Sequence, residues 1–174
     1  LTESVRKQYA NLCGRFYKLK AKWLGKEKIQ YWDRNAPLPF SSDKHYTWDE
    51  SVQIVLEAYQ RFSPRLQELA RPFFDSEHSW IDVPPRDGKR SGAFAMPMPQ
   101  KYHPYLMLNF VGKQNDVLTL AHELGYGCHM RLSITQGELN DDTPLTLAEV
   151  ASVFAEMITF QSLLSRLDDD TEKL

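Results

Sequence analysis

The sequence has few cysteines, no long apolar run and no excess of either charge. Its two cysteines, Cys13 and Cys128, are too few for a disulfide framework. No run approaches 18 consecutive apolar residues and no basic-then-apolar segment opens the chain, so neither a membrane span nor a signal peptide is indicated. Because 21 basic residues stand against 23 acidic ones with no long basic block, nucleic-acid binding lacks its electrostatic footprint. A reducing, cytoplasmic setting is expected.

What is present is the composition of an ordinary globular protein, with 42% apolar and 25% charged residues. No internal repeat, low-complexity segment or linker divides the chain, so we expect one domain over residues 1–174. The chain starts without Met and ends in a charged segment, and we expect it to be a piece of a larger protein.

The first 30 residues have the helical period. Apolar residues recur at spacings of three and four, and Lys and Arg fill the other face. We interpret the basic face mainly as a solvated surface, with a phosphate site or an acidic partner as the alternative. The apolar positions are Val5, Tyr9, Leu12, Phe16, Leu19 and Trp23.

Helices are expected over about residues 1–74 and strands over about 79–111. Thr47 and Glu50 form a capping box at one helix start, and Pro64 suits the first turn of the next. Residues 79–83 and 105–111 are short apolar runs typical of strands, and 90–94 is a candidate third strand after an Asp-Gly turn. A plain hairpin is favoured there over a strand edge open to another backbone.

Two more helices are predicted in the last third of the chain, over about 115–132 and 146–167. The fold class is therefore mainly α with a small antiparallel β-hairpin or sheet. The inward stripe of the last helix is expected at Leu147, Val150, Phe154, Met157, Ile158 and Leu164.

The helix over 115–132 carries most of a zinc-peptidase signature. In the pattern H-E-x-x-H, two imidazoles four residues apart lie about 5–6 Å from each other on one helix face and share a zinc ion, with the Glu as general base. Here His122 and Glu123 are present, but Tyr126 occupies the position of the second His.

A zinc site of this type needs another ligand from a neighbouring helix. Glu149 lies among apolar residues on the helix that returns after a short loop, and a carboxylate placed there needs a partner. Glu156, two turns further along, is suited to orient a ligand imidazole. The alternative is that both are ordinary surface acids, but their spacing after His122 favours a role for Glu149 as ligand.

His129 is a weak substitute for the missing imidazole. It lies seven residues after His122, about 10.5 Å along the helix axis, so both side chains would have to stretch to reach one ion. We expect a packed, hydrogen-bonded histidine. The remaining histidines, His45, His78 and His103, have no metal-ligand spacing and are interpreted as surface or packing residues.

Several motifs, taken in order, resemble the oligoendopeptidase F branch of the thimet-oligopeptidase family of zinc endopeptidases. The resemblance covers about residues 31–167. Its motifs are Asp33-x-x-Ala36-Pro-Leu38, Thr47-Trp-Asp-Glu50, Asp82 followed by Gly88-Lys-Arg-Ser-Gly-Ala93, His122-Glu-Leu-Gly with His129, and Ala148-Glu149-Val-Ala-Ser152 with Glu156.

The resemblance implies a zincin-like catalytic core that hydrolyses short peptides with zinc as cofactor. It makes His122 and Glu149 zinc ligands and Glu123 the base that deprotonates the attacking water. It also makes the segment around the Asp-Gly turn a wall of the substrate groove, where an extended peptide can add to a strand edge. The groove residues implied are Gly88, Arg90, Gly92, Ala93 and Phe94.

The chain departs from this family in two ways. Tyr126 replaces a zinc-binding His, and a phenol with a reference pKa near 10 binds zinc well only when it is deprotonated. Members of the family are also several times longer, with further substrate-binding residues. The leading hypothesis is a zinc metalloendopeptidase core. The alternatives are a catalytically silent peptide-binding module and a purely structural fragment, each lacking the rest of a larger peptidase chain.

Overall fold

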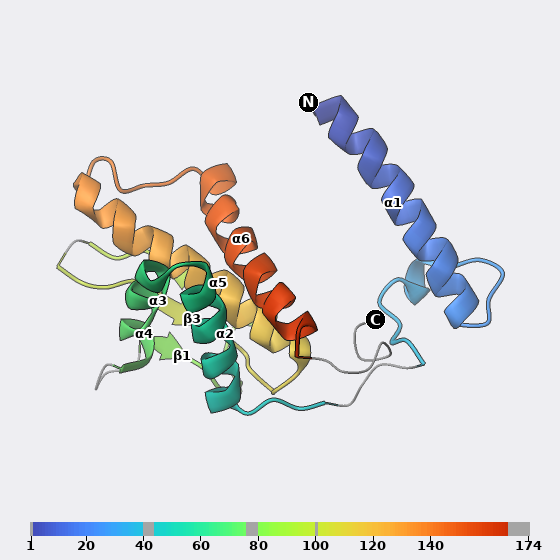
Figure 1. The fold of residues 1–174 in the computed structure, drawn as a ribbon, viewed down its shortest axis with the longest axis horizontal. Coiled ribbons are helices and arrows are strands. Elements are labelled where there is room, and N and C mark those ends of the chain that lie inside the picture. Colours follow the sequence, from blue (N-terminus) through green and yellow to red (C-terminus); the bar gives the residue numbers. More distant parts are fainter. Residues whose placement is uncertain (1, 40–43, 76–79, 100, 167–174) are drawn as a thin grey trace. The chain divides into compact units, whose positions relative to one another are not determined.

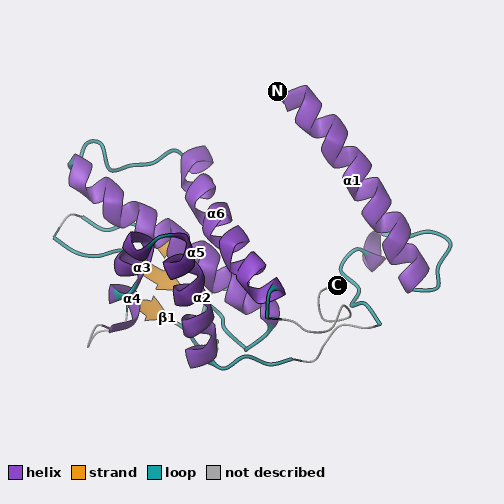
Figure 2. Cartoon of the chain, in the orientation of Figure 1, coloured by secondary structure: helices purple, strands orange, loops and turns teal. Residues whose placement is uncertain are grey.

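The structure is a computed structural model of the chain, and it describes residues 2–39, 44–75, 80–99 and 101–166. These residues fall into two compact units, an N-terminal unit with residues 2–39 and a core unit with residues 44–166. Helices dominate both units (Figure 2). The single domain expected over residues 1–174 stays a prediction.

The N-terminal unit consists of the predicted first helix and a short turn. Helix α1 spans Thr2–Trp23, and the 3-10 turn η1 spans Tyr31–Asp33. Lys26 Nζ lies 2.5 Å from Asp33 Oδ1, and Lys20 Nζ donates to the Arg34 carbonyl oxygen at 2.8 Å. Polar contacts therefore hold this turn.

The core unit is built around one central helix, α5, which contacts α6, α2, α3 and two of the strands (Figure 1). The predicted helix over 115–132 is confirmed by α5, and the one over 146–167 by α6. The elements of this unit are α2 (Trp48–Phe62), α3 (Pro64–Ala70), α4 (Pro72–Asp75), β1 (Ile81–Asp82), β2 (Phe94–Met96), β3 (Tyr105–Met107), α5 (Gln114–Ser133), η2 (Ile134–Gln136) and α6 (Leu145–Leu164).

Local sequence signals correctly predict where helices α2 and α3 of the core unit begin. Thr47 Oγ1 accepts from the Glu50 backbone N–H, and the Thr47 N–H donates to Glu50 Oε2 at 2.7 Å, so the predicted capping box is present. Pro64 is the first residue of α3, as expected. At the start of α5, Asp116 Oδ2 accepts from the backbone N–H groups of Val111 and Lys113.

The small sheet contains the predicted antiparallel strand pair and, in addition, a parallel pair that was not predicted, so the sheet is mixed. The strand order is β1-β3-β2, with β1 parallel and β2 antiparallel to β3. Since β3 lies between the other two, the strands on either side of the turn at Gly88 do not pair, and the prediction of a plain hairpin was wrong. The third strand forms at Phe94–Met96, later than expected, and β2 is an edge strand of the sheet.

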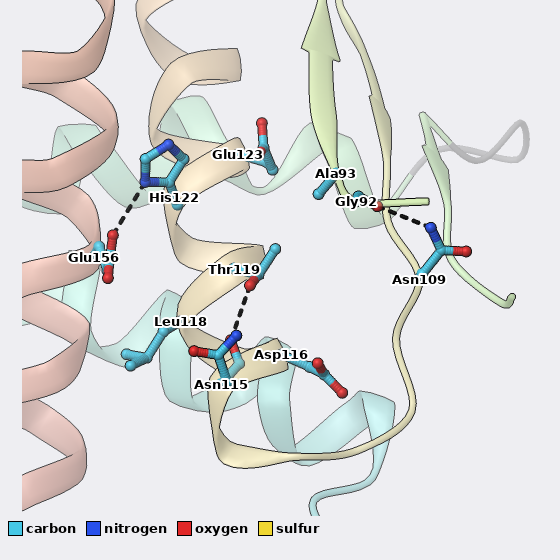
Figure 3. Close-up of a pocket in the computed structure, with 10 residues that line it drawn as sticks. All are labelled: Gly92, Ala93, Asn109, Asn115, Asp116, Leu118, Thr119, His122, Glu123 and Glu156. Atoms are coloured by element: carbon cyan, nitrogen blue, oxygen red, sulfur yellow. Dashed lines mark hydrogen bonds and ion pairs between the residues drawn. The ribbon is translucent and has the colours of Figure 1, made fainter. Parts of the chain in front are cut away.

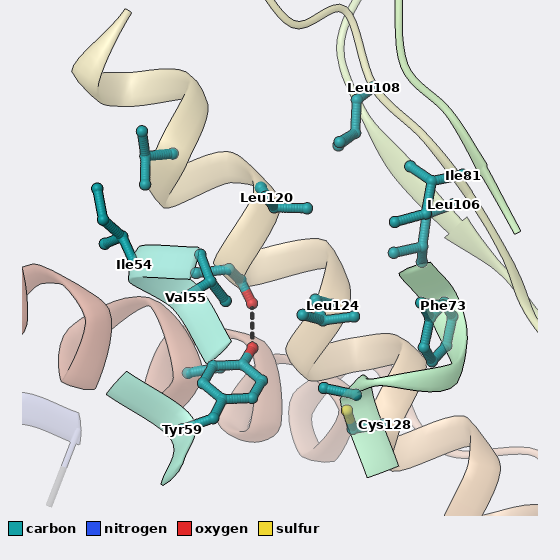
Figure 4. Packing of buried hydrophobic residues seen from close by; sticks show 14 of the residues in the cluster. Ile54, Val55, Tyr59, Phe73, Ile81, Leu106, Leu108, Leu120, Leu124 and Cys128 are labelled. Atoms are coloured by element: carbon teal, nitrogen blue, oxygen red, sulfur yellow. Dashed lines mark hydrogen bonds between the residues drawn. The ribbon is translucent and has the colours of Figure 1, made fainter. Parts of the chain in front are cut away.

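The core lies between α5, α2 and the sheet (Figure 4). Leu120 and Leu124 of α5 are fully buried against Tyr59 of α2 and Leu106 of β3, and Phe73 of α4 joins the same cluster. The buried hydroxyl of Tyr59 donates to the Ala121 carbonyl oxygen at 2.8 Å, which satisfies the one polar atom of that side chain.

Helix α6 packs on α5 through small residues. A Cβ at Gly125 of α5 would lie 2.4 Å from the Ala155 Cβ and 2.9 Å from the Ala151 carbonyl oxygen, so only glycine permits this approach. The buried residues of α6 that make this face are Ala148, Ser152, Ala155, Thr159, Ser162 and Leu163.

The predicted inward stripe of α6 was therefore wrong at four of its six positions. Leu147, Val150, Phe154 and Met157 are exposed, whereas Ile158 and Leu164 are partly buried. Because the helix axes come so close at Gly125, the contact face must be small, and the large apolar side chains point elsewhere. By length and composition alone α6 could cross a membrane, a test that a packed core helix also passes.

Candidate metal centre

His122 lies on the face of α5 that meets α6, between two carboxylates of that helix. Its Nε2 is 3.3 Å from Glu149 Oε2, and its Nδ1 is 3.1 Å from Glu156 Oε2. The two glutamates are seven residues apart on α6, so they approach the two nitrogens of one imidazole. The close packing at Gly125 allows them to reach it.

Glu149 and Glu156 hold different positions around this imidazole. Ser152 Oγ donates to Glu149 Oε2 at 2.8 Å and fixes that carboxylate one turn along α6. A carboxylate on the Nδ1 side, as Glu156 is, commonly orients an imidazole whose other nitrogen binds a metal. Neither glutamate is therefore an ordinary surface acid without a partner.

Glu123 faces away from α6, toward the segment that leads into β2 (Figure 3). Its side chain is buried, and burial raises the pKa of this carboxyl. The neighbouring His122 lowers the pKa, Glu149 raises it, and a hydrogen bond from the Ala95 backbone lowers it. The net direction is upward, so Glu123 holds a proton more tightly than an exposed glutamate does.

Tyr126 follows His122 by one helical turn and keeps its phenol neutral. Burial raises the pKa of the Tyr126 hydroxyl, and the charges of Asp142, Glu149 and Glu123 raise it further. Within the described ranges, no group of three or more His, Cys, Asp or Glu side chains is spaced to hold a metal ion. Tyr126 thus brings no anionic donor to the site at neutral pH.

A groove of about 430 Å³ opens beside His122 and Glu123 (Figure 3). Of the residues that the family resemblance assigned to the groove, Gly92 and Ala93 line it. Gly88, Arg90 and Phe94 are not among its lining residues. The full lining is Gly92, Ala93, Asn109, Asn115, Asp116, Leu118, Thr119, His122, Glu123 and Glu156.

Asn109 is a groove residue that the sequence reasoning missed. Its side-chain amide donates to the carbonyl oxygens of Arg90 and Gly92, at 2.9 and 2.8 Å, and so holds the segment before β2 against β3 (Figure 3). A single amide inside the apolar run 105–111 was the available signal, since an Asn in a strand requires hydrogen-bond partners. Gly125 was also missed, although a glycine inside a helix indicates close packing.

Asp82 and Lys89 shape the turn before this segment. Arg86 pairs with both Asp82 carboxylate oxygens, at 2.6 and 2.7 Å, and the Lys89 Nζ is 3.1 Å from Asp82 Oδ1. The hydrogen bond from Arg86, and then Lys89, lower the pKa of Asp82 to about 2. These ion pairs hold the turn closed, and Gly92 and Ala93, which follow the turn, line the groove.

Two of the other described histidines make contacts away from His122. The His129 Nε2 is 3.1 Å from the Thr143 hydroxyl, which confirms the expectation of a packed, hydrogen-bonded residue. His103 stacks on Trp80 with ring centroids 3.7 Å apart, as expected of a packing residue. His78 lies outside the described residues.

The donor set fits zinc at two of its three protein positions. Zinc binds nitrogen and oxygen at about 2.0–2.2 Å, so two donors of a tetrahedral ion lie about 3.4 Å apart. The 3.3 Å between His122 Nε2 and Glu149 Oε2 agrees with that spacing. In the H-E-x-x-H pattern the remaining position along the sequence is Tyr126, a neutral phenol instead of an imidazole.

The whole chain, residues 1–174, matches peptidase family M3, and the chain belongs to that family. It is 30% identical over 174 residues to an oligoendopeptidase F homolog of Lactococcus lactis subsp. lactis and 27% identical over 176 residues to oligopeptidase PepF of Bacillus subtilis. These alignments cover 99% and 100% of this chain but only 28% and 26% of the relatives.

Solved structures share the fold. A crystal structure of a Chlamydophila abortus protein superposes with a TM-score of 0.78 at 28% identity and covers 97% of this chain and 28% of that one. PZ peptidase A with an inhibitor superposes with a TM-score of 0.75 at 22% identity, over 91% of this chain and 28% of that one. The mainly helical fold class is therefore confirmed.

Proposed function

We propose that the chain is the metal-binding part of a zinc-dependent oligopeptidase, with His122 and Glu149 as zinc ligands and Glu123 as general base. The observation that supports this most is the 3.3 Å between His122 Nε2 and Glu149 Oε2, together with Glu156 on the other ring nitrogen. The membership in family M3 supports the same chemistry. The free thiols of Cys13 and Cys128 agree with a cytoplasmic location, which we also propose.

In this proposal the groove takes an extended stretch of a short peptide. Strand β2 is the edge of the sheet beside Glu123, and an edge strand can pair with another backbone through main-chain hydrogen bonds. Such pairing does not depend on side chains, so it suits many peptide sequences. Asn109 keeps Gly92 and Ala93 in place along this wall.

A zinc ion at this site would polarise the scissile carbonyl group and acidify a water molecule. Glu123 takes the proton of the attacking water and returns it to the departing amine. Its raised pKa serves both steps, because a carboxylate with a pKa nearer to neutrality is a stronger base and can hold the proton until the amine leaves. Glu156 holds the imidazole of His122 in one orientation throughout.

Zinc titration by calorimetry tests the ligand assignment. We expect Glu149→Ala to abolish binding and Tyr126→His to tighten it roughly a hundredfold, since a structural zinc site gains about 10–16 kcal/mol from all its ligands together. His129→Ala is the matched control and should change nothing, because His129 pairs with Thr143 instead. Unchanged zinc affinity in Glu149→Ala would refute the assignment.

Tyr126 favours a second candidate, a module that binds peptides without cleaving them. A site with two strong donors holds zinc weakly, whereas the groove and the edge strand remain. This candidate predicts peptide binding, measured by fluorescence anisotropy, that survives a chelator. Cleavage of a quenched fluorescent peptide by the chain, lost in Glu123→Gln at unchanged zinc affinity, would decide for the peptidase.

A further inference from the structure

The segment between β1 and β2 forms one wall of the groove without regular secondary structure. Residues 84–93 contain neither helix nor strand, yet the last two of them, Gly92 and Ala93, line the groove. Among the described residues, the one backbone hydrogen bond with both ends inside 84–93 joins the Lys89 N–H to the Arg86 carbonyl oxygen, at 3.1 Å. Loops with few backbone hydrogen bonds are ordinarily mobile, so the position of this wall depends on side chains.

Lys89 holds the beginning of this wall. Its side chain is only 3% exposed, and its Nζ lies 2.9 Å from the Pro84 carbonyl oxygen, 3.1 Å from the Asp82 carbonyl oxygen and 3.1 Å from Asp82 Oδ1. An ammonium group has three N–H donors, so all three are used. Burial of a lysine is unfavourable unless its charge is paired and hydrogen-bonded, as it is here. Lys89 is not among the residues that line the groove, so it acts on the groove through the backbone that it binds.

Asn109 holds the other end of the wall (Figure 3). Its amide nitrogen has two N–H donors, and both are used, on the carbonyl oxygens of Arg90 and Gly92. The pairing of Phe94 with Met107 places Gly92 opposite Asn109, so this side chain extends the contact between the two segments beyond the last paired residues. Gly92 has a φ of +86°, a conformation open mainly to glycine, and the contact from Asn109 fixes this otherwise free residue.

The two side chains act on the wall and not on the proposed metal ligands. His122 and Glu149 lie on α5 and α6, whereas Lys89 and Asn109 lie on the segments that flank the sheet. Ordering a loop before its ligand arrives removes a cost in conformational entropy from the binding step. A wall held in advance therefore strengthens the binding of a peptide, and it leaves the affinity for zinc as it is.

We propose that Lys89 and Asn109 are positioning residues that together hold the groove wall ready for an extended peptide. This inference rests on the proposed function, because it takes the groove to be the place where the peptide binds. It adds that peptide affinity is set by two side chains at opposite ends of the wall, which act as a pair. The zinc titration described above tests the metal centre by itself, so failure of one proposal can be told apart from failure of the other.

The test replaces each side chain with an apolar one of similar size, Lys89→Met and Asn109→Leu, in the complete chain. Fluorescence anisotropy measures the binding of a fluorescein-labelled peptide of alternating alanine and serine, and calorimetry measures zinc binding. We expect each variant to weaken peptide binding about tenfold and to change zinc affinity by less than about twofold. The double variant should be little worse than either single one, because both side chains hold the same segment. Lys101→Met, which removes an exposed lysine, is the matched control and should change neither affinity.

A conservative variant and local hydrogen exchange separate positioning from a general loss of stability. Asn109→Gln keeps both amide donors and should recover most of the peptide affinity that Asn109→Leu loses. Amide hydrogen exchange should become faster within residues 84–93 and stay unchanged in α5. The proposal is overturned if the native chain binds no peptide, if both variants keep its peptide affinity, if Asn109→Gln is as weak as Asn109→Leu, or if zinc affinity falls in parallel with peptide affinity. In the first case, zinc binding that depends on Glu149 would still support the metal centre.

Discussion

The two units of this chain treat large apolar side chains in opposite ways. In the core unit, Phe73 of α4 and Leu120 and Leu124 of α5 are fully buried in one hydrophobic cluster. In the N-terminal unit, Phe16 and Leu12 are exposed although they follow a regular helical period. A correct amphipathic pattern therefore ensures a helix but not burial, because burial needs a second surface.

The same contrast holds for glycine inside a helix. Gly125 of α5 is required by the approach of α6, whereas a Cβ at Gly14 of α1 would meet nothing within 4 Å. Gly125 is thus required by helix packing, whereas Gly14 only lowers the helix propensity of α1. The metal centre depends on the first, because the close contact brings Glu149 and Glu156 to His122.

Removing one phenyl ring from each unit should give the largest difference. Phe73→Ala should lower the free energy of unfolding of the core unit by about 3–5 kcal/mol, because it leaves a cavity among buried residues. Phe16→Ala should change the free energy of unfolding of the N-terminal unit by less than about 0.5 kcal/mol, as expected of an exposed side chain. Urea unfolding followed by circular dichroism measures both. Similar losses in the two variants would contradict the contrast.

Replacing the two helical glycines should give effects of opposite sign. Gly125→Ala should destabilise the core unit by about 1–3 kcal/mol and weaken zinc binding, since α6 must move away from α5. Gly14→Ala should stabilise α1 by roughly 0.5–1 kcal/mol. Thermal melts and zinc calorimetry test this, and stabilisation by Gly125→Ala would show that the helices are not packed as described.

Glu123→Gln should stabilise the core unit at neutral pH by about 0.5–2 kcal/mol while removing the proposed base. Because burial raises the pKa of Glu123 in the folded chain, its ionised form costs stability as pH rises through that value. The gain from Glu123→Gln should therefore disappear in acid, where the native carboxyl is protonated. The free energies of unfolding of the native chain and of Glu123→Gln at pH 4 and pH 7 test this. A stabilisation by Glu123→Gln that does not depend on pH would contradict the role of the raised Glu123 pKa.

Acid should weaken each unit slightly through one aspartate. The hydrogen bond from Arg86 lowers the pKa of Asp82, and the one from Lys26 lowers the pKa of Asp33. A carboxylate with a lowered folded pKa contributes stability above its unfolded pKa and loses it as pH falls, for Asp82 between pH 3.8 and about 2. Asp82→Asn should flatten this loss in the core unit, and Asp33→Asn should not. Melting curves between pH 2 and 5 measure it.

Local chemistry along the sequence was enough to predict the helices and the candidate site. Thr47 and Glu50 specify a helix start by hydrogen bonds within four residues, and the period of apolar residues specifies α1 and α5. The pair His122-Glu123, followed by Glu149 and Glu156, was identified because metal chemistry restricts both residue types and spacing. The helix predicted within the first 30 residues is likewise confirmed by α1, Thr2–Trp23.

The tertiary structure alone decided which surfaces meet. The buried face of α6 is the small one because Gly125 brings the helix axes together. Small and large residues of α6 both recur at spacings of three and four, so the period alone does not select the buried face. The order β1-β3-β2, with its edge beside Glu123, depends on pairing between strands far apart in the chain. Asn109 reaches the Arg90 and Gly92 carbonyl oxygens because β2 and β3 pair antiparallel, which places the residues after β3 opposite those before β2. A sequence specifies local hydrogen bonds and periods, whereas contacts between distant segments follow from the shapes that must pack together.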